Sequence, residues 1–204
     1  ARAASPTNRF GFTGPEIFPV DPAIGLLHAA MVVTDLNGDG RPDIAYYGDP
    51  KELVLLYNLG LNNWSAPKRW PIEDGQLTAN GLTSGDLNGD GRPDLVLLSE
   101  KHIYFLAQTA DRSFAEPEKI PVVAPVKSAL VLDVDGDQLN DLLLVDWESP
   151  TPFRFRRQNA AHELGPEIFF PLAPIRSYWA DALEQNKQTF VLTIAQNSGR
   201  AQIS

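Results

Sequence analysis

Short hydrophobic runs alternate with polar turns through most of the 204 residues. The runs are three to five residues long, rich in Val, Ile, Leu and aromatic residues, and bounded by Gly, Pro and Asn. Runs of this length and composition are typical of β-strands rather than helices. They form three successive units, at residues 31–34, 44–47 and 53–57, then 82–84, 95–98 and 103–106, then 130–132, 142–145 and 153–155. The pattern predicts an all-β protein.

An aromatic residue three positions before a proline recurs beside these units. The pairs are Phe12 with Pro15, Trp64 with Pro67 and Phe114 with Pro117, with a looser copy at Leu164-Gly-Pro166. Proline cannot donate a backbone hydrogen bond, so it is tolerated at the edge of a sheet. We therefore expect a fourth, outermost antiparallel strand in each unit. Four-stranded sheets at a regular spacing are typical of the blades of a β-propeller.

A nine-residue segment is repeated between the first and second run of each unit. DLNGDGRPD covers residues 35–43 and again 86–94, and DVDGDQLND covers 133–141, so the starts lie 51 and 47 residues apart. A repeat of this period indicates an array of similar β units. Oxygen-bearing side chains occupy positions 1, 3, 5 and 9 of every copy, and glycine occupies position 4. Such a loop can surround a calcium ion, which prefers six to eight oxygen ligands at about 2.3–2.6 Å.

Two other interpretations of this segment can be compared with the calcium loop. An EF-hand needs a glutamate at position 12 and flanking helices, but position 12 is Tyr46, Leu97 or Leu144, each inside a hydrophobic run. The second alternative is a metal-free turn, because Asp, Asn and Gly all favour turns. Three or more converging carboxylates would repel one another without a cation, so we favour the metal loop.

The repeated segment, followed by a short apolar strand, resembles the FG-GAP/VCBS repeat family, whose calcium loops also occur in integrin α-subunit propellers. The resemblance is clear over about residues 10–172 and weaker in the rest of the chain. It implies a β-propeller that is extracellular, periplasmic or at the cell surface. It also implies calcium in the hairpin between the first two strands of a blade, and it implies no particular reaction.

Carried over position by position, the resemblance implies calcium ligands from the side chains at positions 1, 3, 5 and 9 and from the carbonyl at position 7. The implied ligands are Asp35, Asn37, Asp39, Arg41 (carbonyl) and Asp43; Asp86, Asn88, Asp90, Arg92 (carbonyl) and Asp94; and Asp133, Asp135, Asp137, Leu139 (carbonyl) and Asp141. In the third loop Gln138 replaces the position-6 glycine, and a non-glycine residue at positive φ costs on the order of 1–2 kcal/mol. We expect the extra carboxylate of Asp135 to offset this cost and the third loop to bind as well.

A fourth unit follows, but its loop lacks the pattern of ligands. Counting 48 residues on from Asp133 reaches Asp181, and residues 181–189 have the length of the earlier loops. Positions 3, 5 and 9 are now Leu183, Gln185 and Thr189. We interpret this unit as a blade whose metal loop has decayed, and we do not expect it to bind calcium.

The fourth unit contains three predicted strands, and residues 10–20 supply a candidate for its outer strand. We therefore expect an extension at residues 1–9 and a single propeller domain at 10–204. Its units lie at about 28–72, 79–122, 127–172, and 176–204 plus 10–20. Four blades closed by the N-terminal strand are the preferred interpretation, and part of a ring of six to eight blades is the alternative.

Composition limits the classes of partner. The net charge is −9, and ten of the 26 acidic residues lie in the three loops; three calcium ions would leave a charge of about −3. No basic face is evident for a phosphate backbone, so we expect no nucleic-acid partner. There is no cysteine, which excludes disulfides and thiolate metal sites. No apolar stretch approaches the roughly 18 residues of a membrane span, so none is expected.

One basic and aromatic run stands out at residues 153–157. Strand alternation predicts that Phe153 and Phe155 face a neighbouring blade while Arg154, Arg156 and Arg157 face solvent. Binding of an anionic glycan by these arginines is the alternative.

Other aromatic residues could in principle offer sugar-stacking platforms, and Trp70 and Trp147 are the better surface candidates because neither recurs in the other units. Packing in the core remains the preferred interpretation even for these two, because large aromatic side chains are usually buried between sheets.

No catalytic constellation is recognisable. His28, His102 and His162 lie in different units without a shared motif.

The leading hypothesis is a secreted or cell-surface, calcium-stabilised propeller that binds protein or carbohydrate, for example in adhesion, with calcium in a structural role. A polysaccharide lyase or glycoside hydrolase is an alternative, but a hydrolase needs two carboxylates about 5–10 Å apart and no such pair stands out. A scaffold in an extracellular assembly is a further alternative.

Overall fold

The computed structural model describes residues 30–172, 174–183, 188–196 and 201–203. Over these ranges the chain forms 17 β-strands, and no helix is assigned. The all-β class predicted from the sequence is therefore confirmed. None of the described residues belongs to a helix that is long and apolar enough to cross a membrane.

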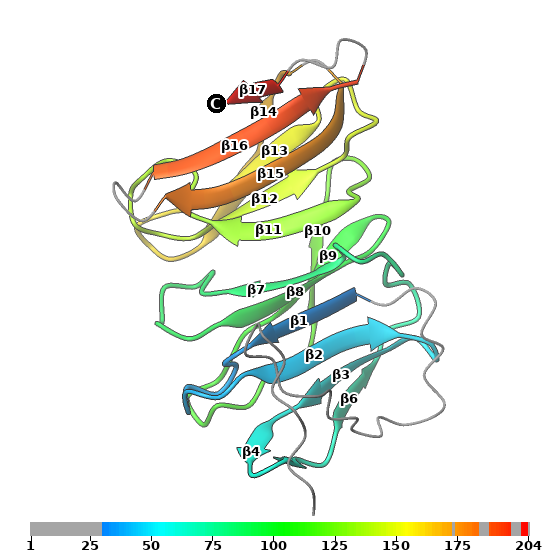
Figure 1. The fold of residues 1–204 in the computed structure, drawn as a ribbon, viewed down its shortest axis with the longest axis vertical. Coiled ribbons are helices and arrows are strands. Elements are labelled where there is room, and N and C mark those ends of the chain that lie inside the picture. Colours follow the sequence, from blue (N-terminus) through cyan, green and yellow to red (C-terminus); the bar gives the residue numbers. More distant parts are fainter. Residues whose placement is uncertain (1–29, 173, 184–187, 197–200, 204) are drawn as a thin grey trace, which may run out of the picture.

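Four antiparallel sheets follow one another along the chain (Figure 1). The first consists of β1 (Ala30–Thr34), β2 (Asp43–Gly48), β3 (Glu52–Leu56) and β6 (Lys68–Pro71). The second consists of β7 (Leu82–Gly85), β8 (Asp94–Leu98), β9 (His102–Leu106) and β10 (Glu118–Pro121). The third consists of β11 (Ser128–Leu132), β12 (Asp141–Val145), β13 (Phe153–Gln158) and β14 (Leu164–Phe170). The predicted four-stranded antiparallel blades are confirmed.

The fourth sheet has three described strands: β15 (Ile175–Leu183), β16 (Gln188–Ala195) and β17 (Ala201–Ile203). The fourth strand predicted for it, at residues 10–20, lies outside the described residues. The number of blades and the closure of a ring therefore stay predictions.

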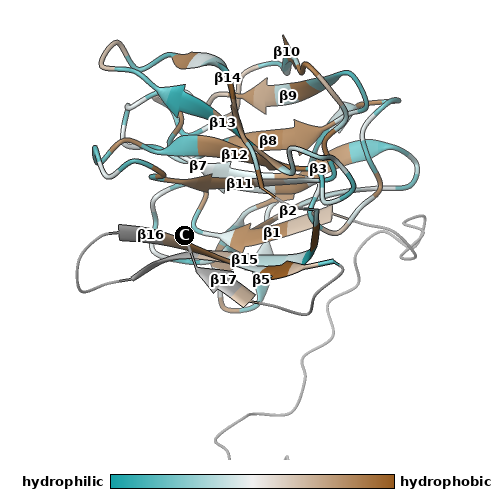
Figure 2. Ribbon diagram, turned by 90° about the horizontal axis from the view of Figure 1, so that it is seen from above, coloured by the Kyte–Doolittle hydropathy of each residue, from teal (hydrophilic) through white to brown (hydrophobic). Residues whose placement is uncertain are grey.

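The second strands of the second and third sheets are buried along their whole length. All five residues of β8 and all five of β12 are buried, because a neighbouring sheet covers each face. The first strands pack against one another, β1 against β7 and β7 against β11. Figure 2 shows hydrophobic residues along β8, whereas much of β13 is hydrophilic. The three candidate metal loops lie between the first and second strands of the first three sheets, so they extend directly from this buried core.

The hydrophobic core lies between successive sheets. Between the first two sheets, Leu53, Leu55 and Trp70 share a buried cluster with Leu106 and Phe114. Trp70 is 9% exposed, so its predicted packing in the core is confirmed. Separate clusters fill the interfaces of the second sheet with the third and of the third with the fourth.

The first sheet carries an additional small hairpin that the sequence patterns did not indicate. Strands β4 (Asn58–Gly60) and β5 (Asn63–Trp64) pair with each other between β3 and β6. Gly60, Leu61 and Asn62 all have positive φ angles, of 80°, 52° and 62°. These angles turn the chain tightly enough to form the hairpin before the outer strand β6.

The prediction that the arginines of residues 153–157 face solvent is wrong for two of them. Arg154 is 1% exposed and Arg156 is 9% exposed. Both donate to Glu167 of β14, with Arg154 Nη1 at 3.0 Å from Oε2 and Arg156 Nη2 at 3.3 Å from Oε1. Alternation along β13 was predicted correctly, but a sheet that is covered on both faces has no solvent side. The buried face is tolerated because one carboxylate pairs with both guanidinium groups and backbone carbonyls accept hydrogen bonds from them.

The fourth sheet also differs from the expected loop geometry. Strands β15 and β16 continue into the span assigned to the decayed loop, so that residue 181 pairs with residue 190 and residue 183 with residue 188. Residues 184–187 lie outside the described part of the chain. The fourth unit thus has a longer antiparallel hairpin where the other three units have a nine-residue loop.

Candidate metal-binding loops

The first aspartate of each loop organises the backbone around its own carboxylate. Asp35 Oδ1 accepts hydrogen bonds from the N–H groups of Asn37 (3.2 Å), Gly38 (2.7 Å) and Asp39 (3.2 Å). Its Oδ2 accepts from the N–H of Gly40 at 2.8 Å. The same four bonds recur in the second loop, and two equivalent bonds recur in the third. The repeated sequence therefore folds into a repeated local structure that curls around the position-1 carboxylate.

These hydrogen bonds also control the charge of the first carboxylate. Desolvation alone would raise the pKa of Asp35, but the backbone N–H bonds from Gly40, Gly38 and their neighbours outweigh it, so the pKa is lowered. Asp35 is thus held ionised and oriented, as a cation ligand must be.

The last aspartate of each loop is fully buried at the start of the second strand. Asp43 accepts from the N–H of Leu36 (2.9 Å) and of Asn58 (2.8 Å). Asp94 and Asp141 make the corresponding pairs of bonds in the second and third loops. Burial, opposed by these hydrogen bonds, raises the pKa of all three, and for Asp94 to about 6. A divalent cation would favour the ionised form of these carboxylates and so compensate for their burial.

Positive φ angles occur where the loop pattern places glycine. Gly38 at position 4 and Gly40 at position 6 have φ of 75° and 81°. In the third loop Gln138 takes the position-6 conformation with φ of 72°, which is the strained geometry expected from its sequence position. The backbone shape is therefore kept in the third loop despite the substitution.

The third loop brings most of its predicted ligands together. Carboxylate oxygens of Asp133, Asp135 and Asp141 all lie within 4.8 Å of one another. Two ligands on opposite sides of one calcium ion lie about 4.6–5.2 Å apart, twice the usual Ca–O distance. The residues of this loop therefore fit a calcium ion. The fourth predicted side chain, Asp137, instead accepts from the N–H of Leu139 at 2.9 Å.

In the first two loops the position-5 carboxylate is directed toward a neighbouring arginine. Asp39 forms an ion pair with Arg41, and Asp90 forms the same pair with Arg92. Asn37 Nδ2 also donates to Asp39 Oδ2 at 3.1 Å. Each arginine supplies positive charge inside an acidic loop, where an ion would otherwise supply it. The role of the position-7 carbonyls as ligands stays a prediction.

The third loop obtains its positive charge from a different strand. Leu139 replaces the position-7 arginine, and Arg157 of β13 pairs with Asp135 and lies 4.0 Å from Asp137. Of the three arginines in residues 153–157, this one is half exposed. It therefore pairs with the aspartates of the third candidate loop, a contact that its position in the sequence did not indicate.

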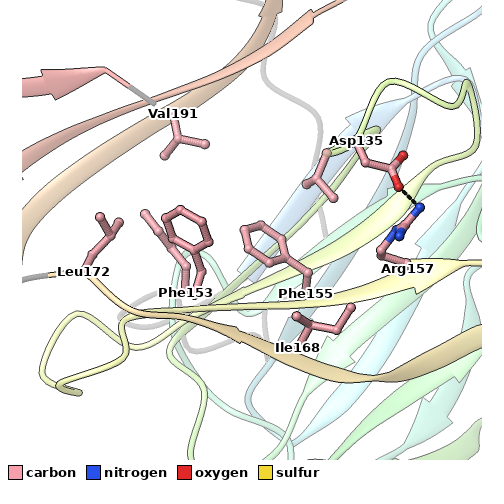
Figure 3. Close-up of a pocket in the computed structure, with 9 residues that line it drawn as sticks. Asp135, Phe153, Phe155, Arg157, Ile168, Leu172 and Val191 are labelled. Atoms are coloured by element: carbon pink, nitrogen blue, oxygen red, sulfur yellow. Dashed lines mark ion pairs between the residues drawn. The ribbon is translucent and has the colours of Figure 1, made fainter.

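The Asp135–Arg157 pair stands at one side of a pocket between the third and fourth sheets (Figure 3). The pocket has a volume of about 310 Å³, and its walls are mainly apolar. They include Phe153 and Phe155 of β13, Ile168 and Phe170 of β14, Leu172, and Val191 of β16.

The first sheet offers a direct comparison for this pocket. Phe170 pairs with Phe153 as Trp70 pairs with Leu53. Trp70 is 9% exposed in a cluster that includes Phe114 of the next sheet, whereas Phe170 is 44% exposed. The pocket thus corresponds to the place that the cluster containing Trp70 and Phe114 fills between the first two sheets.

The sequence patterns did not indicate a residue at the end of the third strand, or just beyond it, that holds each loop in place. This residue is Asn58, Gln108 or Gln158, and its N–H donates to the buried position-9 aspartate of its own loop at 2.8, 2.9 and 2.8 Å, respectively. The Asn58 and Gln108 carbonyls also accept from Nε of the position-7 arginine, at 2.7 and 3.3 Å. An amide side chain just after the third hydrophobic run of every unit was the available signal.

Turns of the next sheet cover the first two loops. A Cβ added to Gly38 would lie 2.7 Å from Arg112 Nη1, and one added to Gly89 would lie 1.8 Å from His162 Nδ1. Arg112 and His162 occupy equivalent turns before the outer strands and have φ of 65° and 61°. The position-4 glycine therefore serves the contact between sheets as well as the backbone conformation of the loop.

Solved structures with similar folds support the propeller architecture. The chain matches a lectin of Agrocybe aegerita, whose structure concerns recognition of non-reducing terminal N-acetylglucosamine, with a TM-score of 0.62, 16% identity and coverage of 88% of this chain. It also matches BBS1N, solved in complex with ARL6DN, with a TM-score of 0.55, 13% identity and coverage of 90%. The chain spans 52% and 58% of the lengths of those two proteins. At this identity the likeness concerns the fold alone.

Sequence comparison identifies the repeats themselves. Curated proteins give no significant match. The FG-GAP-like repeat family matches residues 35–97 and 86–144, and repeats of this family often bind calcium. The two matches together run from residue 35 to residue 144, more than half of the 204 residues and all three loops, so the chain belongs to the FG-GAP-like repeat family.

Proposed function

We propose that this chain is a calcium-stabilised β-propeller module that binds a protein or a carbohydrate in an extracellular, cell-surface or periplasmic setting. The observation that carries the proposal is the convergence of three carboxylates in the third loop, within 4.8 Å of one another, together with the same backbone curl in the other two loops. Each loop draws its ligands from one hairpin, which suits a structural ion. Extracellular calcium modules typically have dissociation constants of about 10⁻⁴–10⁻³ M, which matches a calcium-rich exterior.

Calcium would stabilise the folded state because it offsets the charge that the fold concentrates. Each loop buries its position-9 aspartate next to the position-1 and position-5 carboxylates, whose charges raise the pKa of Asp43, Asp94 and Asp141 further. An ion that binds the folded state and not the unfolded chain adds about 2.7 kcal/mol when its free concentration is 100 times the dissociation constant. Loss of calcium is therefore expected to loosen the ends of the sheets where the loops lie.

The structural neighbours suggest which ligands to test first. One is a lectin and another was solved with a protein partner, so both classes remain within the proposal. The experiment is to apply the purified chain to a glycan array that includes N-acetylglucosamine-terminated glycans, in calcium and in EDTA. Calcium-dependent retention on a defined set of glycans would support carbohydrate binding. No retention in either buffer would exclude carbohydrate as the ligand and favour a protein ligand. Cleavage of a polysaccharide would favour the enzyme alternative.

The proposed module includes a fourth blade completed by residues 10–20. The pocket between the third and fourth sheets supports this assignment, because Phe170 is exposed where its counterpart Trp70 is covered by a cluster that contains Phe114. The repeat places Phe12 in register with Phe114, since each stands three residues before a proline. The proposed occupant of the pocket is therefore the side chain of Phe12.

The test of this closure is the stability of Phe12→Ala. A buried phenylalanine replaced by alanine costs about 3–5 kcal/mol, so a loss of at least about 2 kcal/mol in denaturant unfolding is expected. Leu61→Ala is the matched control, because Leu61 is 97% exposed and a surface change is expected to stay within about 0.5 kcal/mol. Equal, small effects of both changes would refute closure by this segment and favour a larger ring.

A further inference from the structure

We propose that Gln108 and Gln158 are positioning residues that couple the first and second calcium loops to the sheet that follows each, so that the geometry of these two metal sites depends on how the neighbouring sheet packs. This inference rests on the proposed calcium function. Both side chains are 2% exposed, although glutamine is ordinarily a surface residue. Gln108 lies shortly after β9 and Gln158 is the last residue of β13. Both reach across the interface to the loop of the preceding sheet.

Gln108 joins the first loop to the second. Its Nε2 donates to the carbonyl of Leu36, at position 2 of the first loop. Its own backbone N–H donates to Asp94 Oδ1, at position 9 of the second loop, at 2.9 Å. The Leu36 N–H in turn donates to Asp43 Oδ2 at 2.9 Å. One residue thus holds the backbone of one loop and a predicted ligand of the next.

Gln158 repeats this arrangement between the second and third loops. Its Nε2 donates to the carbonyl of Asp86 at 3.4 Å and to that of Asn140 at 3.2 Å. Its N–H donates to Asp141 Oδ1 at 2.8 Å, and its Oε1 is 3.1 Å from His162 Nδ1. The amide therefore contacts two loops with its side chain alone. The three loops are joined in one series of hydrogen bonds that crosses two sheet interfaces.

The contacted carbonyls matter because they fix peptide planes between ligand positions. The Leu36 carbonyl belongs to the peptide that precedes Asn37, so its orientation sets the direction of the position-3 side chain. The Asp86 carbonyl belongs to the peptide whose N–H, on Leu87, donates to Asp94 Oδ2 at 3.0 Å. Partners that orient metal ligands from outside the coordination shell typically contribute 10–100-fold in metal affinity. Loss of the amide donor is expected to weaken the contacted loop to this extent.

The asymmetry of Gln108 gives the sharpest experiment. Gln108→Met removes the donor to the first loop while keeping the length of the side chain and the backbone N–H that holds Asp94. Two parent proteins isolate single loops by removing one exposed aspartate from each of two loops. The first-loop parent carries Asp90→Ala with Asp135→Ala, and the second-loop parent carries Asp39→Ala with Asp135→Ala. Calcium binding is measured by calorimetry in each parent with and without Gln108→Met.

The expected result is a rise in the calcium dissociation constant of about tenfold in the first-loop parent, with less than a twofold change in the second-loop parent. Equal weakening in both parents, or no change in the first-loop parent, would overturn the inference, since a general loss of packing would not distinguish the loops. If neither parent binds calcium while both remain folded, the proposed calcium function is wrong, and this inference, which depends on it, is wrong as well. If the first-loop parent binds normally with Gln108→Met, the inference alone fails.

A second variant keeps the inference testable if Gln108→Met does not fold. Gln158→Met is expected to weaken the second loop and, through the lost contact to the Asn140 carbonyl, the third loop, while leaving the first loop unchanged. Weakening confined to the third loop would contradict the proposed coupling between sheets.

Discussion

Glutamate 167 is predicted to be the most sensitive polar residue of the third sheet. Its side chain is 0% exposed, and it forms ion pairs with both Arg154 and Arg156, whose side chains are 2% and 11% exposed. Glu167 Oε1 also accepts from the N–H of Val123 at 2.9 Å. The two guanidinium groups additionally donate to carbonyls of residues 121, 124 and 125 in the segment that leads to the third sheet. One carboxylate therefore pairs with two buried guanidinium groups and also fixes the segment that connects the second sheet to the third.

Glu167→Gln keeps the size of the side chain and removes its charge. The change leaves two buried guanidinium groups without a counterion and turns an amide donor toward one of them. Breaking a buried ion pair by removing one partner costs about 3–5 kcal/mol, and the loss of two pairs places the expected value in the upper part of that range. For a domain of this size each kcal/mol lowers Tm by about 2–4 °C. A fall in Tm of about 10 °C or more is expected.

Glu52→Gln is the matched control for this measurement. Glu52 of β3 pairs with Arg69 of β6 at 2.8 Å, also between a third and a fourth strand, but the two side chains are 25% and 29% exposed. Such an exposed pair contributes about 0–1 kcal/mol. Urea unfolding at constant calcium measures both variants. A loss below about 1 kcal/mol for Glu167→Gln, equal to the control, would refute the claim that burial makes this cluster different.

Local backbone geometry and packing decide the effect of three smaller changes. Gln138→Gly relieves a φ of 72° and is expected to raise stability by about 0.5–1 kcal/mol; a loss in denaturant unfolding would contradict this. The methyl group of Gly89→Ala would collide with the histidine ring of the next sheet, whereas a methyl group at Gly136 would meet no atom within 4 Å. Gly89→Ala is therefore expected to lower the free energy of unfolding by about 1–2 kcal/mol more than Gly136→Ala. Equal losses for the two variants would contradict this. The Tyr104 hydroxyl donates a hydrogen bond to Asp74 and lowers the pKa of that carboxyl below its usual value of 3.8. The ionised carboxylate therefore stabilises the folded state above pH 3.8, and this stabilisation is lost as the pH falls through the pKa of Asp74 in the folded state. Tyr104→Phe is expected to raise the pKa of Asp74 in an NMR titration, and an unchanged value would contradict the assignment.

Much of the fold could be predicted because hydrophobic periodicity and the repeat agree. The runs at residues 95–98 and 142–145 correspond closely to β8 and β12, since strands buried on both faces are continuous apolar segments. The direction of Arg154 could not be predicted, because strand alternation separates two faces without stating which one meets solvent. The signal for its burial was Glu167, a single acidic residue in the neighbouring strand, and its pairing depends on a register that the sequence does not give.

The ligands within each candidate loop could be predicted from the sequence, but the residues of neighbouring sheets that contact the loops could not. The spacing of Asp133, Asp135 and Asp141 predicted a shared site, and the structure brings their oxygens together. The roles of Gln108 and Gln158 could not be predicted, because each contacts a loop residue 72 positions earlier in the chain. Such contacts depend on how neighbouring sheets pack, and the pattern within one repeat contains no information on that packing.

The most direct test of the central claim is thermal unfolding of the purified chain in EDTA and across a calcium titration, with magnesium as the control ion. At a free calcium concentration 100 times the dissociation constant, each site is expected to add about 2.7 kcal/mol. At about 2–4 °C per kcal/mol this raises Tm by roughly 5–10 °C for each ion. The expected result is a saturating rise in Tm, with bound calcium detected by calorimetry. An unchanged Tm with no bound calcium would contradict it.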